Sequence, residues 1–158
     1  RPEVCRHVTT RERTMDHRGS LDALQVACLV TGATGLLMVA AVVGPAAPLL
    51  DRFVDLAAWP LDGAQAVETD AARLLAAISG GLLAGWATTT WLLLRRVHAR
   101  DPAVGTTVIL PGFAVWFVLD GVGSVLAGAT FNLVPNTAFL LLFAVPILRE
   151  HRRRRASA

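Results

Sequence analysis

The stretch LLAAISGGLLAGWATTTWLLL, residues 74–94, contains no charged side chain, and Arg95 and Arg96 follow it directly. A helix needs about 20 apolar residues to span the roughly 30 Å hydrocarbon layer of a bilayer, because each residue adds about 1.5 Å. These 21 residues therefore predict a transmembrane helix that ends at a polar boundary.

Three other stretches are uncharged or nearly so, and we predict spans at residues 23–44, 106–127 and 133–148. The last of these is short for a bilayer. No heptad or alternating pattern competes with this interpretation. The expected fold class is an all-α four-helix transmembrane bundle, which forms a single membrane domain over residues 23–148. A polar N-terminal tail, residues 1–22, and a basic tail, residues 149–158, flank this domain.

The first block leaves two alternatives open. A cleaved signal peptide has an apolar core of about 7–15 residues, which is shorter than residues 23–44, but Pro45, Ala46 and Ala47 keep that alternative open. Met15 lies a short distance before the block and is a candidate for the true start, in which case residues 1–14 are not native.

Composition agrees with a membrane location. Hydrophobic residues make up 54% of the chain, the mean hydropathy is +0.52, and 17% of residues are charged, against about 25% in soluble domains. All 15 basic residues are Arg, which favours a bacterial, GC-rich source. The positive charge lies beside the predicted spans, so we expect no nucleic-acid partner despite a pI near 10.1.

The Arg distribution predicts the orientation. Residues 95–101 and 149–155 hold eight Arg, whereas residues 45–73 hold two and residues 128–132 hold none. Arg-rich loops stay in the cytoplasm. Four spans place both basic segments on one side, so we expect a multi-pass protein of the bacterial inner membrane with both termini in the cytoplasm.

The connection between the first two spans contains a short amphipathic helix near residues 49–59. At helical spacing, Asp51, Arg52 and Asp55 share one face, and the apolar residues share another. Pro60 ends this helix. The sequence therefore predicts a helix that lies on the outer membrane surface. Thr69 is a candidate N-cap for the second span.

Small residues recur at helical spacing and predict close helix packing. Gly81 and Gly85 form a GxxxG pattern, and Thr31 and Gly35 form a similar stripe in the first span. Gly121 marks a third stripe. We expect packing within the chain, with a homo-oligomer face as the alternative. On this interpretation, Gly81→Leu or Gly85→Leu destabilises the bundle.

Asp120 is the one charged residue inside a predicted span. A carboxylate in the membrane is costly and needs a reason. The tight link after the third span brings Asn136 and Thr137 close to Asp120, and Ser124 lies one turn further along its own helix. The carboxylate is then either a structural clamp to the fourth helix or a proton- or cation-binding site. Asn132 is expected to cap the fourth helix.

No catalytic set, phosphate loop or metal-ligand spacing occurs in the sequence. A haem held between membrane helices needs histidines within the spans. All four histidines lie outside the predicted spans: His7, His17, His98 and His151. We expect no enzyme activity, no metal and no cofactor. The expected function is a structural or accessory membrane subunit, with a membrane protein partner or a homo-oligomer beside the lipid bilayer. The alternative is a small transporter or channel that uses Asp120.

Overall fold

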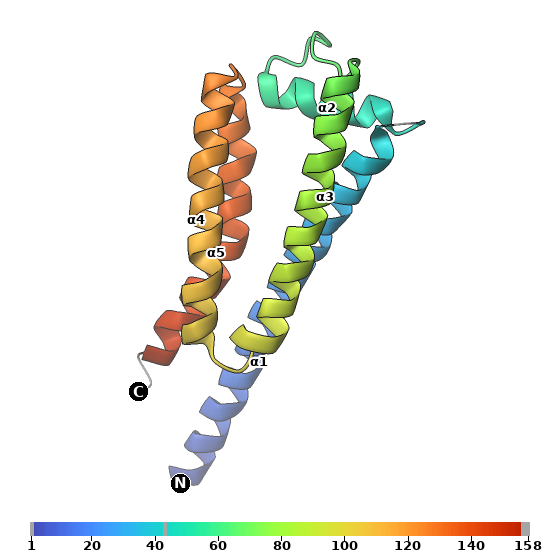
Figure 1. The fold of residues 1–158 in the computed structure, drawn as a ribbon. Coiled ribbons are helices and arrows are strands. Elements are labelled where there is room, and N and C mark those ends of the chain that lie inside the picture. The colour runs from blue at the N-terminus through green and yellow to red at the C-terminus, as the bar shows by residue number, and fades with distance from the viewer. Residues whose placement is uncertain (1, 43, 156–158) are drawn as a thin grey trace.

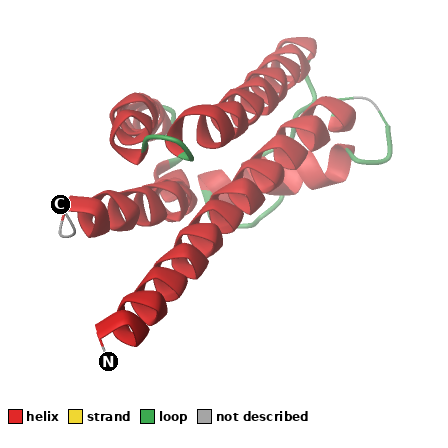
Figure 2. Cartoon of the chain, turned by 90° about the horizontal axis from the view of Figure 1, so that it is seen from below, coloured by secondary structure: helices red, strands yellow, loops and turns green. Residues whose placement is uncertain are grey.

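A computed structural model describes the backbone of residues 2–42 and 44–155, and the side chains of residues 19, 21–42 and 44–153. The described chain is helical apart from its connections, as Figure 2 shows. Its elements are α1 (Pro2–Ala41), α2 (Ala47–Ala58), α3 (Asp70–Leu93), a π-helical turn (Leu94–His98), α4 (Pro102–Leu126), a 3₁₀ turn (Thr130–Asn132) and α5 (Leu133–Arg155).

Four helical segments of the described chain are long and apolar enough to cross a membrane: Leu21–Ala41, Asp70–His98, Pro102–Leu126 and Thr130–Arg153. The short helix α2 lies between the first two. The protein is therefore an all-α, multi-pass membrane protein, as its apolar blocks predict. The second, third and fourth segments are longer than the uncharged blocks because helices continue through polar flanks. Helix α1 likewise extends beyond its apolar segment, without a break, through residues 2–20.

The helices form two antiparallel pairs, α1 with α3 and α4 with α5 (Figure 1). The pairs meet mainly where α1 contacts α5, whereas α3 makes few contacts with α4. Helix α2 lies across the end opposite the N and C termini. The two pairs separate toward that end (Figure 1).

The core lies where the two pairs converge, and α1, α4, α5 and the π-helical turn contribute to it. Its buried members are Leu24, Ala27, Cys28, Leu94, Ile109, Phe113, Phe143 and Ile147. Five rings, which we call the aromatic cluster, join α3 to the other pair: Trp86, Phe113, Trp116, Phe139 and Phe143. The centroid of Phe113 lies 4.5 Å from that of Trp86 and 4.4 Å from that of Phe143.

Helix α2 differs from the expected surface helix in its polar face. Asp55 is buried, because residues 60–69 fold back over this face, and both of its carboxylate oxygens accept the Gly63 N–H at 3.1 Å. Asp51 accepts the Val67 N–H at 2.8 Å. The apolar face of α2, including Phe53, is exposed. The acidic side chains thus organise a loop instead of facing solvent.

Two contacts fix the ends of the helices near α2. The ring of Trp59, directly after α2, stacks on Phe131 of the 3₁₀ turn with centroids 5.0 Å apart, which joins α2 to the α4–α5 connection. Thr69 caps α3 as predicted, since its hydroxyl accepts the Ala72 N–H at 3.1 Å. At the other end, Asp101 caps α4 through the N–H groups of Ala103 and Val104.

Replacing Asp55 by Ala is expected to free the loop of residues 60–69. The change leaves the Gly63 N–H without its acceptor, at a local cost of about 1–3 kcal/mol. Hydrogen exchange at Gly63 should accelerate by about tenfold or more. Asp62→Ala is the control, because Asp62 is exposed and accepts only the neighbouring Ala64 N–H. Equal exchange rates at Gly63 in the two variants would contradict the assignment.

Candidate functional site

The side of the α4–α5 pair that faces the other helices changes character along its length. On α4, Phe113, Trp116, Asp120 and Ser124 recur at spacings of three and four residues and share one face. Asn132, the last residue of the 3₁₀ turn, continues into Asn136, Phe139 and Phe143 of α5 at the same spacings. The face is aromatic near the core and becomes polar toward the end that carries α2.

The polar part of this face is assembled by hydrogen bonds between helices. Asn136 donates its side-chain amide to the Asp120 carboxylate. Asn132 donates to the same carboxylate oxygen at 3.3 Å and to the Ser124 hydroxyl oxygen at 2.9 Å. We call these four residues, Asp120, Ser124, Asn132 and Asn136, the Asp120 cluster. All four side chains are half-buried.

Three of the four site residues expected from the sequence therefore meet, and the fourth does not. Thr137 is exposed, and its hydroxyl donates to the Leu133 carbonyl oxygen of its own helix at 2.7 Å. Asn132 was expected only to cap α5, but its side chain lies in the site instead. The i, i+4 spacing of Asn132 and Asn136 is the sequence signal that could have identified both as partners of Asp120.

The Asp120–Asn136 contact is expected to contribute to stability. In a double-mutant cycle, Asp120→Ala and Asn136→Ala should show a coupling of about 1 kcal/mol in detergent unfolding. The matched control pairs Asp120→Ala with Thr137→Ala, for which we expect additive effects because Thr137 bonds its own backbone. A coupling equal to that of the control pair would mean that the Asp120–Asn136 contact does not contribute to the free energy of unfolding.

The predicted packing glycines lie in two different environments. A Cβ atom built on Gly35 would lie 2.5 Å from the carbonyl oxygen of Gly80, and one built on Gly80 would lie 2.5 Å from that of Gly35. The two backbones therefore touch at this crossing. Gly81 and Gly85 instead have no atom within 4 Å of such a Cβ.

The close contact of α3 thus differs by one residue from the expected GxxxG pair. One residue is a rotation of about 100° on a helix, so Gly81 faces away when Gly80 faces α1. The other expected packing positions lie at interfaces. Thr31 is buried on α1, and a Cβ on Gly121 would lie 3.0 Å from the Leu133 side chain of α5.

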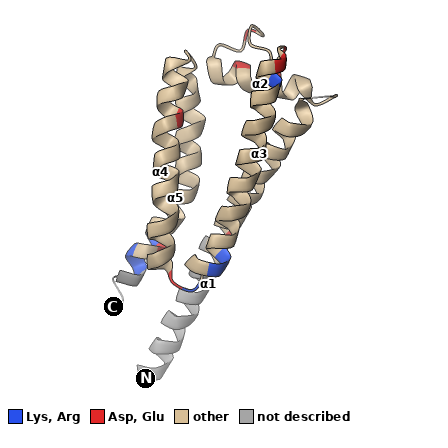
Figure 3. Cartoon of the chain, in the orientation of Figure 1, with Lys and Arg blue, Asp and Glu red and all other residues tan. Residues whose placement is uncertain are grey.

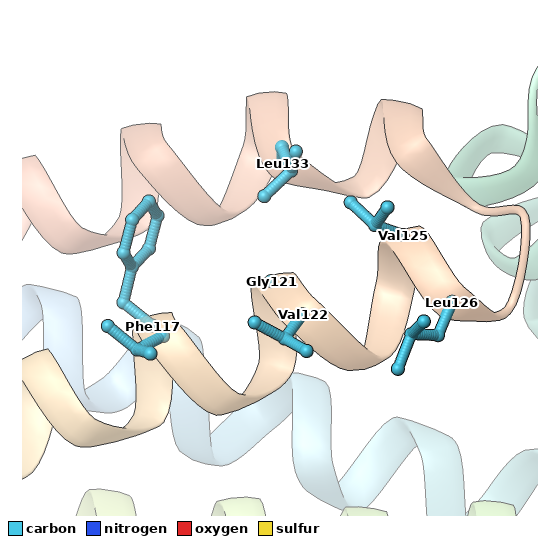
Figure 4. Close-up of a pocket in the computed structure, with 7 residues that line it drawn as sticks. Phe117, Gly121, Val122, Val125, Leu126 and Leu133 are labelled. Atoms are coloured by element: carbon cyan, nitrogen blue, oxygen red, sulfur yellow. The ribbon is translucent and has the colours of Figure 1, made fainter.

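The back of the α4–α5 pair carries an open apolar groove of about 420 Å³. Figure 4 shows residues of α4 and Leu133 of α5 around it. Its lining is Phe117, Val118, Gly121, Val122, Val125, Leu126 and Leu133. None of these side chains is polar, so the groove offers no group that would orient a polar ligand.

The charged side chains gather at the two ends of the molecule. Figure 3 shows Arg at the end with the termini and mostly acidic residues around α2. His98 is 1% exposed, although the sequence places it in a basic loop. A Cβ on Gly105 would lie 2.5 Å from the Cβ of His98, so α4 packs directly against this histidine.

Within the described residues, no group of three or more His, Cys, Asp or Glu side chains is placed to hold a metal ion. No protein family, curated protein or solved structure matches the chain. Its own contacts are therefore the basis for a functional proposal.

Proposed function

We propose that this protein is a structural or accessory subunit that packs against a larger partner in the bacterial inner membrane. The observation that carries the proposal is the outward face of α3, where Gly81 and Gly85 are exposed with open space beside them. Small residues allow close approach of helices in lipid, where apolar area alone gives no driving force. The adjoining face of the same helix makes such a contact with α1 through Gly80.

A second surface supports the same proposal. Leu49, Phe53 and Leu56 form an apolar face on α2, and they are 55%, 48% and 37% exposed. This face lies at the same end of the molecule as the start of α3 (Figure 1). A partner in contact with α3 could therefore also cover α2. The proposal assigns the chain no catalytic reaction.

Photocrosslinking in native membranes tests the accessory role. A photoreactive amino acid at position 85 should give one adduct of defined mass, whereas the same group at Val115, which is 59% exposed on α4, should give only lipid products. Identical products at both positions would refute the accessory role. An adduct of twice the chain mass would replace the separate partner with a second copy of this protein.

We further propose that both termini lie in the cytoplasm. The support is the Arg-rich end formed by residues 95–101 and the end of α5, opposite the acidic end around α2 (Figure 3). Alkaline phosphatase fused after residue 65 should be active outside the membrane, and the same enzyme fused after residue 98 should be inactive. Activity at residue 98 would reverse the orientation.

The Asp120 cluster favours a second candidate, a small transporter or channel that couples to a proton or a cation. A membrane carboxylate at a polar cluster is a typical ion or substrate position. Asp120→Asn separates this candidate from a purely structural clamp. An amide at this position retains the hydrogen-bonding capacity of the clamp, so stability should persist, whereas charge-dependent transport should be lost. Charge-dependent transport that persists in Asp120→Asn would exclude a coupling role for Asp120, and absence of transport by the unmodified protein would exclude this candidate.

A further inference from the structure

We propose that the Asp120 cluster binds an organic ammonium or similar bulky cation, whose apolar part rests on the aromatic cluster. This inference rests on the second candidate function and names its class of ligand. The inference combines the negative charge of Asp120 with the position of rings of the aromatic cluster, which lie one helical turn away.

The charge of the site comes from one residue. Asp120 is the only charged side chain in residues 23–44, 74–94, 106–127 and 133–148. Its hydrogen-bond partners, Asn132 and Asn136, are neutral amides. A carboxylate in a low-dielectric environment is costly without a counter-charge. Because the described spans supply no cation beside Asp120, a bound cation would provide that counter-charge.

The hydrogen bonds to the Asp120 carboxylate indicate which kind of cation the site favours. Both amides direct their nitrogen atoms at the carboxylate, so N–H groups surround one of its oxygens. A hard metal ion instead requires about six oxygen ligands. An ammonium group can pair with the remaining carboxylate oxygen alone, provided that other favourable contacts surround its substituents. The arrangement therefore favours an organic cation over a metal ion.

An aromatic surface lies beside the carboxylate. Trp116 precedes Asp120 by four residues, and Phe139 follows Asn136 by three, so both rings lie one turn from the cluster. Trp116 lies 5.5 Å from Trp86 and 5.3 Å from Phe139, centroid to centroid. These three side chains are half-buried and retain accessible surface. Aromatic faces attract cations, and they bind quaternary ammonium groups in particular.

Tryptophan fluorescence of the purified protein in detergent tests the inference, with tetraphenylphosphonium as the probe. We expect saturable quenching, because Trp86 and Trp116 line the proposed site. Tetraphenylborate has nearly the same shape and the opposite charge, and should not compete. Asp120→Asn should weaken tetraphenylphosphonium binding about tenfold or more. Asp62→Asn removes an exposed outer charge and should leave binding unchanged.

Trp116→Leu provides a second variant that keeps the carboxylate, and it should also weaken binding. Thermal unfolding of each variant verifies that it is folded. Equal binding of the two probes, or binding unaffected by Asp120→Asn, would mean partitioning onto apolar surface and would overturn the inference. If Asp120→Asn abolishes transport in a protein that does not bind the probe, the proposed transporter stands and the ligand class is wrong. If the probe binds Asp120 but no transport occurs, the site stands without the transporter.

Discussion

Gly80→Ala is expected to destabilise the protein by about 1–3 kcal/mol, although alanine is the better helix former. The added methyl group would lie 2.5 Å from the Gly35 carbonyl oxygen and 2.9 Å from the Met38 Cβ. Both positions are rigid parts of α1, so the two helices must separate along their contact. Gly35→Ala should behave similarly, since its methyl group would lie 2.7 Å from the Ala84 backbone nitrogen.

Gly81→Ala is the matched control, one residue away on the same helix. Its methyl group would meet no atom within 4 Å, so the helix propensity of Ala should stabilise α3 by up to about 1 kcal/mol. In thermal unfolding in detergent, we expect Gly80→Ala to melt roughly 5 °C or more below Gly81→Ala. If Gly81→Ala is the more destabilising change, the α1–α3 crossing is assigned to the wrong face.

Phe113→Ala is expected to cost about 3–5 kcal/mol of unfolding free energy. Phe113 is 2% exposed, and its ring contacts Trp86 of α3 and Phe143 of α5. The loss is mainly one of packing contacts, because lipid is as apolar as the core. Since the aromatic cluster joins the two helix pairs, the variant should also loosen the association of α3 with α4.

Phe53→Ala is the control for Phe113→Ala, because it removes the same side chain from a position that is 48% exposed. We expect it to cost less than about 1 kcal/mol. Similar losses in the two variants would indicate that the aromatic cluster does not hold the helix pairs together. The comparison requires unfolding in the same detergent, with the helix content of the folded variants measured by circular dichroism.

The sequence predicts the candidate spans well because the bilayer imposes a length and a composition on each helix separately. An uncharged block such as residues 74–94 satisfies both conditions without reference to the rest of the chain. The Thr69 cap is predictable for a similar reason. Thr69 needs only the backbone of the following turn, which any helix at that position provides.

The polar face of α2 could not be predicted from periodicity. The spacing of Asp51, Arg52 and Asp55 places them together, but it does not determine that a loop covers Asp55 and leaves Arg52 exposed. Residues 60–69 fold back, and Asp55 becomes a buried acceptor for the Gly63 N–H. Loop closure depends on contacts between residues far apart in sequence, and local amphipathicity does not encode these contacts.

The sequence alone determined the four apolar segments, of which residues 74–94 are one, and their order along the chain. It also determined the short helix before the second segment, because each of these elements depends on local composition. It also indicated the approach of Asn136 to Asp120, since a short link leaves little freedom. Only the tertiary structure decided that Gly80 and not Gly81 meets α1, and that Asn132 joins the Asp120 cluster. A rotation of about 100° separates neighbouring residues on a helix, and only the packed partner helix fixes that rotation.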